Sequence, residues 1–308
     1  MKKYITESAL IFTTIIWGGA FPAVKSALSY VSPMTFLSLR FCFALLLLLP
    51  FVKKVFSSVT KDLFTSGLLL GAFYFLGFAF QTVGLKYTTA TKSGFITGTF
   101  VIFTPILQMI IEKRKPSKES MAGISLVIIG LVLLSSGASS TLDVFKEIGS
   151  NFNYGDFLTL ICAIFYAFYI VYLDVVSKKF EFMPLVFFQV AVTAVGSVVV
   201  ALLFSSINVE SLNINFSAVL IFAILYTGLL STILTTILQT RYQKYISPTK
   251  AGIIFSLEPI FSAVFAFFTL NEKISIFGGI GCLFIFGGLL VSEIFSLNSL
   301  ESISSGEG

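Results

Sequence analysis

Ten apolar stretches of about 20 residues follow one another along this chain. A helix that crosses the hydrocarbon core of a bilayer needs about 20 mostly apolar residues, so each stretch can span a membrane once. The connections between them are too short to hold a soluble domain. The sequence therefore predicts an all-α integral membrane protein with ten transmembrane helices, at roughly residues 5–24, 33–52, 64–84, 93–112, 119–136, 155–176, 184–205, 216–238, 249–270 and 274–295.

The composition excludes several classes of protein. Charged residues make up 11% of the chain, whereas a soluble domain carries about 25%. The chain has no His, which removes the usual general base and the commonest metal ligand. Its Cys residues are widely spaced within apolar stretches and are expected to be small core side chains. We expect no metal, no cofactor, no nucleic-acid partner and, without a P-loop, no ATP-driven pumping by this chain alone.

The distribution of Lys and Arg predicts the orientation of the chain. Glu7 and Trp17 interrupt the pattern of a cleaved signal peptide, so the first stretch is counted as a span. Cytoplasmic connections carry an excess of basic residues, and both termini are therefore predicted to be cytoplasmic. The predicted inner segments then hold Lys2, Lys3, Lys53, Lys54, Lys61, Lys113, Arg114, Lys115, Lys118, Lys178, Lys179, Arg241, Lys244 and Lys250, and the outer ones hold Lys25, Lys86, Lys92, Lys146 and Lys273.

An internal repeat divides the chain into two halves. Residues 81–94 align with residues 239–252 at an offset of 158, and seven of the fourteen positions are identical. Each half holds five spans, and an odd number places the second copy upside down in the membrane. We therefore expect two inverted five-helix repeats, at residues 1–138 and 154–297, joined by a loop at 139–153. Inverted halves suit alternating access; the alternative is that the duplication only records the history of the gene.

Several short motifs resemble the drug/metabolite transporter superfamily of the EamA type. They are Trp17-Gly-Gly-Ala-Phe21-Pro-Ala-Val-Lys25, Leu39-Arg40-Phe41, Gly94-Phe-Ile-Thr-Gly98, Thr104-Pro105, Phe255-Ser-Leu-Glu258-Pro259 and Asn271-Glu272-Lys273. The resemblance covers nearly the whole chain. It implies a ten-helix carrier of the inner, cytoplasmic membrane, in a family that includes exporters of amino acids and other metabolites.

Two charged residues fall inside predicted spans. Arg40 lies roughly 10 Å into the second span, and Glu258 roughly 15 Å into the ninth. A charge at the bilayer centre costs about 2.5–3.5 kcal/mol on insertion scales, so both should face protein or water. Arg40 is a candidate contact for an anion or carboxylate, and Glu258 a candidate for proton coupling. The alternative for both is a structural role in helix pairing.

Two prolines interrupt the fourth and ninth spans. Pro105 and Pro259 lack an N–H, so the carbonyls of Val101 and Phe255 lose their helical partners. Such freed carbonyls are tolerated in a membrane where they face protein or a water-filled cavity. The two prolines are candidate hinges, and packing kinks are the alternative.

Helical spacing gathers polar side chains on single faces of four spans. We expect a substrate pathway between spans three, four, eight and nine, with spans one and six contributing. Ser and Thr also serve helix–helix contacts in membranes, which is the alternative for any one of them. The candidates are Tyr74, Gln81, Thr97, Thr104, Gln108, Ser231, Thr235, Gln239, Glu258 and Ser262, with the aromatic residues Trp17, Tyr166 and Tyr169, Arg40, and the weaker candidate Gln189.

Spans five and ten are rich in Gly, which permits close approach of helices. They are expected to pack each half or to form a homodimer contact. The polar residues 298–308 are expected to be disordered.

The sequence predicts a secondary active transporter that exports or exchanges a small metabolite, such as an amino acid, by alternating access. The alternative is a membrane-embedded enzyme or lipid-handling protein. A recognisable pair of nucleophile and base would favour that alternative, and the sequence shows none.

Overall fold

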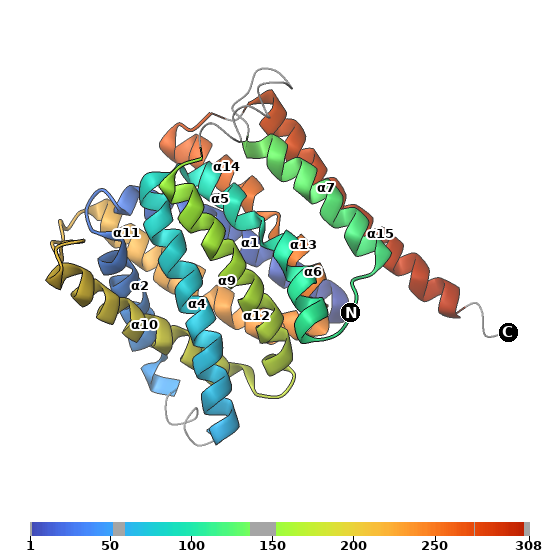
Figure 1. The fold of residues 1–308 in the computed structure, drawn as a ribbon, viewed down its shortest axis with the longest axis horizontal. Coiled ribbons are helices and arrows are strands. Elements are labelled where there is room, and N and C mark those ends of the chain that lie inside the picture. The colour runs from blue at the N-terminus through green and yellow to red at the C-terminus, as the bar shows by residue number, and fades with distance from the viewer. Residues whose placement is uncertain (1, 52–58, 136–151, 274, 305–308) are drawn as a thin grey trace.

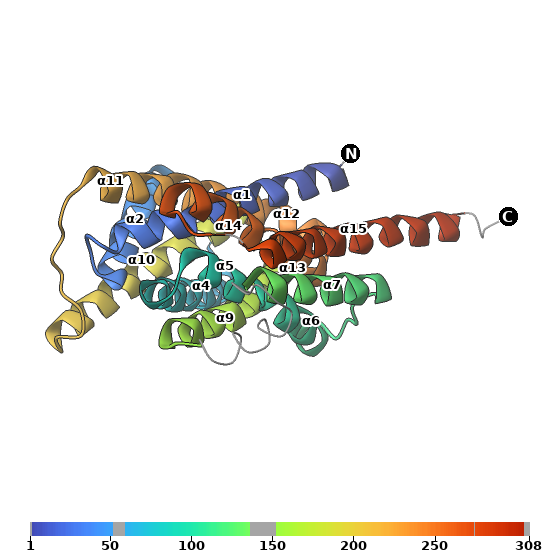
Figure 2. The same cartoon turned by 90° about the horizontal axis from the view of Figure 1, so that it is seen from above.

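A computed structural model describes the backbone of residues 2–51, 59–135, 152–273 and 275–304. All regular elements in these residues are helices, and one isolated bridge pairs Val31 with Ile214. The helices form a bundle from which one pair, α7 and α15, stands apart at the edge (Figures 1 and 2). α1 begins and α15 ends on the same side of this bundle.

The first half of the chain forms five helical segments in sequence. Thr60 and Thr89 begin α4 and α5 as N-caps, because their side chains accept hydrogen bonds from the free N–H groups of the first turn. The elements are α1 (Lys2–Ala27), α2 (Pro33–Leu48) with the short η1 (Leu49–Phe51), α4 (Lys61–Tyr87), α5 (Ala90–Gly98) followed by α6 (Phe100–Ile111), and α7 (Lys118–Ser135).

The second half repeats this order of elements. Asn153 and Asp156 form a capping box at the start of α9, and Ser217 and Ser247 cap α11 and α13. The elements are α9 (Tyr154–Ser177), α10 (Phe182–Ser206), α11 (Ala218–Leu225) continued by η2 (Tyr226–Leu234), α12 (Thr235–Tyr242) and η3 (Gln243–Tyr245), α13 (Pro248–Phe255) followed by α14 (Glu258–Leu270), and α15 (Ile276–Ser304).

Eight helical segments in the described part of the chain are long and apolar enough to cross a membrane. They correspond to predicted spans one to four and six to nine. Predicted span ten appears as a shorter apolar stretch, Ile276–Ser292, and span five as the 18-residue helix α7. The inverted relation of the two halves stays a prediction.

The fourth and ninth spans are each broken near their middle. α5 ends at Gly98 and α6 starts at Phe100, while α13 ends at Phe255 and α14 starts at Glu258. At the repeat offset of 158, these breaks fall at equivalent positions. Pro259 lies directly after its break, but Pro105 lies inside α6. In the first half the interruption is therefore at Gly98 and Thr99, where a Gly weakens the helix, and a hinge role for either proline stays a prediction.

The Gly-rich helices α7 and α15 pack against each other. A Cβ added to Gly123 would lie 2.7 Å from the carbonyl oxygen of Gly288, and one on Gly130 would lie 2.6 Å from that of Gly281. Only Gly allows this backbone approach. Because α7 and α15 belong to different halves, the contact joins the halves of one chain. A homodimer contact through either helix stays a prediction.

Two predicted segments end differently or fall outside the described residues. α15 extends to Ser304 and so includes residues 298–304, and disorder of the tail stays a prediction. They contain neither Pro nor Gly, and extending an existing helix avoids the cost of nucleation. Residues 305–308 and most of the predicted loop 139–153 lie outside the described residues.

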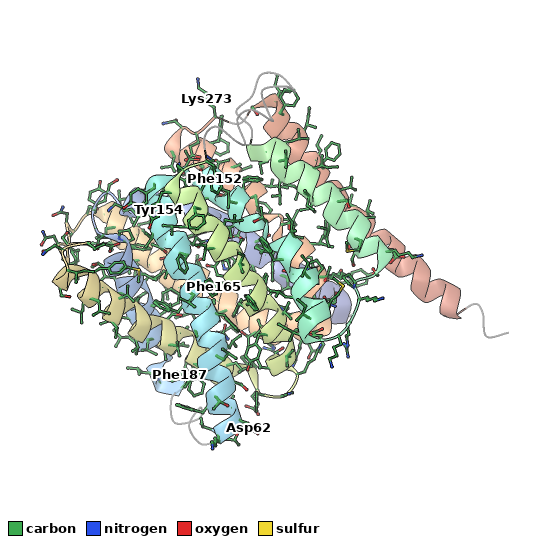
Figure 3. All side chains as sticks on the ribbon, in the orientation of Figure 1. Asp62, Phe152, Tyr154, Phe165, Phe187 and Lys273 are labelled. Carbon is green, nitrogen blue, oxygen red and sulfur yellow. The ribbon has the colours of Figure 1, made fainter. Side chains whose placement is uncertain are left out.

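The side chains at the two ends of the bundle show how the spans run. Asp62, at the start of α4, and Lys273, after α14, lie at opposite ends (Figure 3). These ends are the predicted inner and outer faces of the membrane.

Candidate functional site

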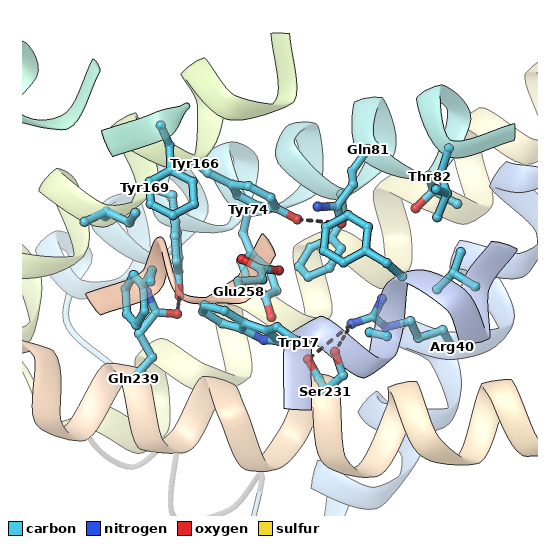
Figure 4. A pocket seen from close by; sticks show the side chains of 18 residues that line it. Trp17, Arg40, Tyr74, Gln81, Thr82, Tyr166, Tyr169, Ser231, Gln239 and Glu258 are labelled. Atoms are coloured by element: carbon cyan, nitrogen blue, oxygen red, sulfur yellow. Dashed lines mark hydrogen bonds between the residues drawn. The ribbon is translucent and has the colours of Figure 1, made fainter. Parts of the chain in front are cut away.

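An internal cavity lies where α1, α2, α4, α6, α9 and the eighth and ninth spans meet. Its wall includes the first residues after both helix breaks, Phe100 and Glu258. Figure 4 shows Arg40 and Ser231 toward one end, Tyr169 and Gln239 toward the other, and Trp17 and Glu258 between them. The wall consists of Trp17, Ala20, Phe21, Val24, Arg40, Tyr74, Phe78, Gln81, Thr82, Leu85, Phe100, Tyr166, Tyr169, Ile170, Ser231, Gln239, Phe255 and Glu258.

Arg40 brings a buried positive charge to the cavity. Its side chain is 2% exposed. Nε donates to Thr232 Oγ1 at 2.8 Å, and Nη2 donates to the carbonyl and hydroxyl oxygens of Ser231, both at 3.2 Å. The guanidinium also lies 4.5 Å from the ring centroid of Phe78. Among the described residues Nη1 has no hydrogen-bond partner, so it remains available for a carboxylate or other anion.

The partners of Arg40 lie on an irregular part of the eighth span. η2 is a π-helical segment, in which the backbone hydrogen bonds skip one residue more than in an α-helix. This widened turn presents the Ser231 carbonyl oxygen, which accepts from both Arg40 and Thr235 Oγ1. The local irregularity therefore supplies acceptors for a charge that would otherwise be unsatisfied in the membrane.

Glu258 brings a carboxyl group to the same cavity. It is the first residue of α14 and is 6% exposed. No N–H or O–H donor among the described residues reaches its carboxyl oxygens, although most buried polar groups find a partner. The carboxyl group is therefore placed to receive a proton or a cationic group from the cavity.

Three Tyr side chains and two Gln side chains line the rest of the polar wall. Tyr74 exchanges a hydrogen bond with Thr236 at 2.7 Å. Tyr166 donates to Gln81 Oε1 at 3.3 Å, and Tyr169 donates to Gln189 Oε1 at 2.6 Å. The Tyr169 hydroxyl also lies 3.3 Å from Gln239 Oε1. These bonds fix the rings, so the cavity presents aromatic faces with a few polar groups, as small-molecule sites do.

Nine of the predicted pathway residues line this cavity, and the others lie behind or beyond its wall. Thr97, Thr235 and Gln189 hold lining residues from behind: Thr97 accepts from Gln81, Thr235 from Trp17, and Gln189 from Tyr169. Thr104 donates to the carbonyl of Phe100 within its own helix. Ser262 donates to the carbonyl of Ala90, and Gln108 accepts from Thr249. The last two contacts join α14 to α5 and α13 to α6.

Two ion pairs lie at repeat-related positions on opposite ends of the bundle. Lys92, on α5, contacts Asp156 of α9 at 2.5 Å, and Lys250, on α13, contacts Glu7 of α1 at 2.8 Å. Lys92 and Lys250 are equivalent at the offset of 158. Each pair joins the start of a broken helix to the first helix of the other half.

The predicted outer end carries a second pair of charged contacts. Lys25 donates to the carbonyl oxygens of Leu85 and Thr88 at 2.8 and 2.6 Å, which caps the end of α4. The carboxylate of Glu272 accepts from the N–H groups of Ala90 and Thr91, both at 3.0 Å, which caps the start of α5. The Lys25 contact joins α1 to the end of α4 within the first half, and the Glu272 contact joins the second half to the first.

Comparison with known proteins decides the family. The sequence model of the EamA-like transporter family matches residues 5–136 and again residues 153–293. This chain belongs to the EamA-like transporter family. A member described as an uncharacterized transporter of Archaeoglobus fulgidus is 33% identical over 272 residues, covering 88% of this chain and 80% of the relative. The uncharacterized transporter YyaM of Bacillus subtilis is 26% identical, covering 95% of each chain.

A solved crystal structure shares the fold of this EamA-like chain. It superposes with a TM-score of 0.71 at 16% sequence identity, covering 94% of this chain and 98% of the other. The family and the apolar helices identify the chain as a multi-pass membrane protein and a transporter. The resemblance found in the sequence motifs is confirmed.

Sequence patterns did not reveal every residue of the site in this EamA-like transporter. The ring of Phe78 contacts Arg40, and the hydroxyl of Thr232 accepts the Nε–H of Arg40. The sequence contains 36 Phe, so residue type alone does not distinguish Phe78 from the others. Phe78 does follow Tyr74 by four residues, so helical spacing places it on the predicted polar face. Nothing in the sequence marks residues 226–234 as π-helical.

Proposed function

We propose that this protein is a secondary active transporter that exports or exchanges a small amphoteric metabolite, such as an amino acid, by alternating access. The observation that supports this most directly is the placement of Arg40 and Glu258 on the wall of one cavity. Arg40 supplies a site for a carboxylate, and Glu258 supplies a site for an amine or a proton. The aromatic faces of Trp17, Tyr74 and Tyr166 suit an apolar side chain or a cation.

The arrangement of the two halves supports alternating access. In inverted-repeat carriers, the substrate lies near the midplane at broken helices, and one half rocks against the other. Here the breaks at Thr99 and at Ser256–Leu257 both adjoin the cavity. α2 packs on α10, and α7 packs on α15, so equivalent helices of the two halves pair with each other. The two repeat-related ion pairs would then close the site on opposite faces in turn.

The cytoplasmic membrane is the proposed location, with both termini inside. The basic residues that follow α6 and α9 and precede α13 lie at the end of the bundle opposite Lys273. That distribution agrees with the positive-inside rule. The resemblance to ten-helix inner-membrane carriers points to the same location.

Counterflow in proteoliposomes tests the transport function. Vesicles loaded with unlabelled amino acids should accumulate the labelled one that the protein carries, and the rate should saturate. We expect the wild-type rate to depend on external pH and the rate of Glu258→Gln to lose part of that dependence, because Glu258 is the carboxyl group on the wall of the central cavity and the chain has no His.

Gln189→Glu is the control. It adds a carboxyl group behind the wall of the central cavity, so it shows whether an added carboxyl group outside the cavity alters the pH profile of transport. Absence of counterflow across amino acids, amines and organic acids would contradict a transporter of this class. Chemical conversion of the solute would favour a membrane enzyme instead. An unchanged pH profile in Glu258→Gln would remove the proton-coupling role of that residue alone.

A further inference from the structure

A second cavity lies away from the central one, where α6 ends and α9 ends. It has a volume of about 220 Å³. Two carboxyl groups, Glu112 and Asp174, and three basic groups, Arg114, Lys178 and Lys244, line it. Glu112 follows the last residue of the span Ala90–Ile111, so this cavity is at the predicted cytoplasmic end.

Two buried carboxyl oxygens in this cavity lack a hydrogen-bond donor. Asp174 is 1% exposed, and its Oδ2 pairs with Lys178, which follows the last residue of α9. Its other oxygen, Oδ1, has no partner among the described residues, and neither has Glu112 Oε1. Both carboxyl groups line this one cavity, and they interact electrostatically. Two ionised carboxyl groups that are buried near each other repel, and a proton shared between them removes this repulsion.

We propose that Glu112 and Asp174 form a proton-binding site, in which one proton bridges Glu112 Oε1 and Asp174 Oδ1. The proton is donated by one carboxyl oxygen and accepted by the other, so both unpartnered oxygens are satisfied by a single ligand. The bridged pair carries one negative charge, which Lys178 neutralises. Release of the proton would leave two carboxylates beside Lys178, Arg114 and Lys244, with water entering the cavity.

The electrostatic surroundings agree with this geometry. Burial, together with the neighbouring Asp174 carboxyl group, raises the pKa of Glu112 to about 7. Lys178 on α9 and Arg114 in the segment after α6 oppose that rise. Lys244 on η3 faces the same cavity. The site would therefore gain and lose its proton within the range of cytoplasmic pH.

A role for this site in transport rests on the proposed function. Glu112 follows α6, and Gln108 on the same helix holds Thr249 of α13 through a hydrogen bond of 2.6 Å. Protonation beside this contact would favour the conformation in which α6, α9 and α13 stay together. The proton-binding site itself is testable without any transport measurement.

The test is the pH dependence of thermal stability in the full-length protein, purified in detergent. In the unfolded chain Glu titrates near its usual value of 4.5. The stabilisation by the bound proton is therefore complete below about pH 4.5 and is lost as the pH rises through about 7. Glu112→Gln keeps a neutral side chain at every pH. We expect the wild-type melting temperature to fall relative to that of Glu112→Gln by a few degrees between about pH 5 and 9.

Matched variants and an independent signal complete the experiment. Glu181→Gln changes an exposed carboxyl group and should run parallel to the wild type. Infrared difference spectra in a Glu258→Gln background should show a protonated carboxyl band that titrates near neutral pH and is absent in Glu112→Gln and Asp174→Asn. Parallel melting curves for wild type and Glu112→Gln, or no such band, would overturn the site. If sodium stabilised the wild type at high pH but did not stabilise Asp174→Asn, the ligand of this site would be a metal cation, and the proton-binding proposal would be wrong.

Discussion

At the scale of single residues, Arg40 shows how this chain keeps a charge inside the membrane. Its guanidinium donates three hydrogen bonds to two neighbouring residues of η2 and faces the ring of Phe78. Hydrogen bonds to charged groups contribute about 1.5–3 kcal/mol each, more than neutral ones. Loss of one of these acceptors should therefore lower the free energy of unfolding more than loss of a Thr hydroxyl that bonds only to a backbone carbonyl.

Substitution of Thr232 tests this difference. Thr232→Val preserves the shape of the side chain but leaves Arg40 Nε, which is buried, without its acceptor. We expect a loss of about 1–3 kcal/mol in the free energy of unfolding. The measurement is unfolding in denaturant of the purified protein in mixed micelles.

Thr227→Val is the matched control. Thr227 is fully buried on the same helical segment, but its hydroxyl only donates to the carbonyl of Ala223. That carbonyl remains in the helix, so we expect a smaller loss, about 0.5–1 kcal/mol. Equal losses in the two variants would contradict a special role for the bond to Arg40.

Residue type explains what could be predicted at this scale. Arg40 and Glu258 could be found from the sequence because a charge within an apolar span is costly and therefore stands out. Trp17 and Gln81 could be found by spacing and by equivalence in the repeat. Phe78, Phe100 and Phe255 line the same wall. They could not be found from the sequence, because an apolar residue in an apolar helix can face either the cavity or the lipid.

At the scale of elements, the breaks in the fourth and ninth spans limit what helical spacing can predict. The polar face that joined Thr97, Thr104 and Gln108 assumed one continuous helix. The chain interrupts that helix at Thr99, so residues after the break no longer share the face of those before it. Thr104 and Gln108 accordingly lie away from the central cavity. Ser262 is on α14 together with Glu258, but its hydroxyl donates to the carbonyl of Ala90 instead of lining the cavity. The breaks depend on tertiary packing, which a single sequence does not display.

Paired neutralisation of Lys92 and Lys250 tests the two closures. Lys92→Gln removes the ion pair with Asp156, and Lys250→Gln removes the equivalent pair with Glu7. A single Cys at Thr82, on the cavity wall, reports access when Cys42, Cys162 and Cys282 are replaced by Ala. We expect Lys92→Gln to increase labelling by an impermeant reagent from the outer face, and Lys250→Gln to increase it from the inner face.

Each variant is the control for the other, because both remove one Lys at equivalent positions. Both pairs are largely shielded from solvent, and Asp156 is fully buried. Removing one partner of such a pair costs more than the roughly 0.2–1 kcal/mol of an exposed pair, so we expect the labelling rate to rise at least a few-fold. An increase from the same face in both variants would contradict closures on opposite faces.

At the scale of the whole molecule, the long apolar stretches determined most of the fold in advance. Their number and spacing predicted helices close to those observed, because a membrane requires each crossing segment to satisfy its own backbone hydrogen bonds. The pairing of α7 with α15 could not be predicted, since Gly-rich faces fit a partner in the same chain or in a second copy.

The orientation of the molecule is testable with two engineered Cys residues. Lys115→Cys follows α6, and Lys273→Cys follows α14, in a chain without the three native Cys. If the termini are cytoplasmic, an impermeant thiol reagent added to intact cells should label Lys273→Cys alone. Both positions should react after the membrane is permeabilised. Labelling of Lys115→Cys alone in intact cells would show the opposite orientation.

The contact between α7 and α15 also has a consequence for the order of synthesis. The ribosome makes α7 well before α15, so the carbonyl groups of Gly123 and Gly130 meet Gly288 and Gly281 only after α15 has been made. The face of α7 that packs on α15 is therefore left without its partner while the helices between them are made.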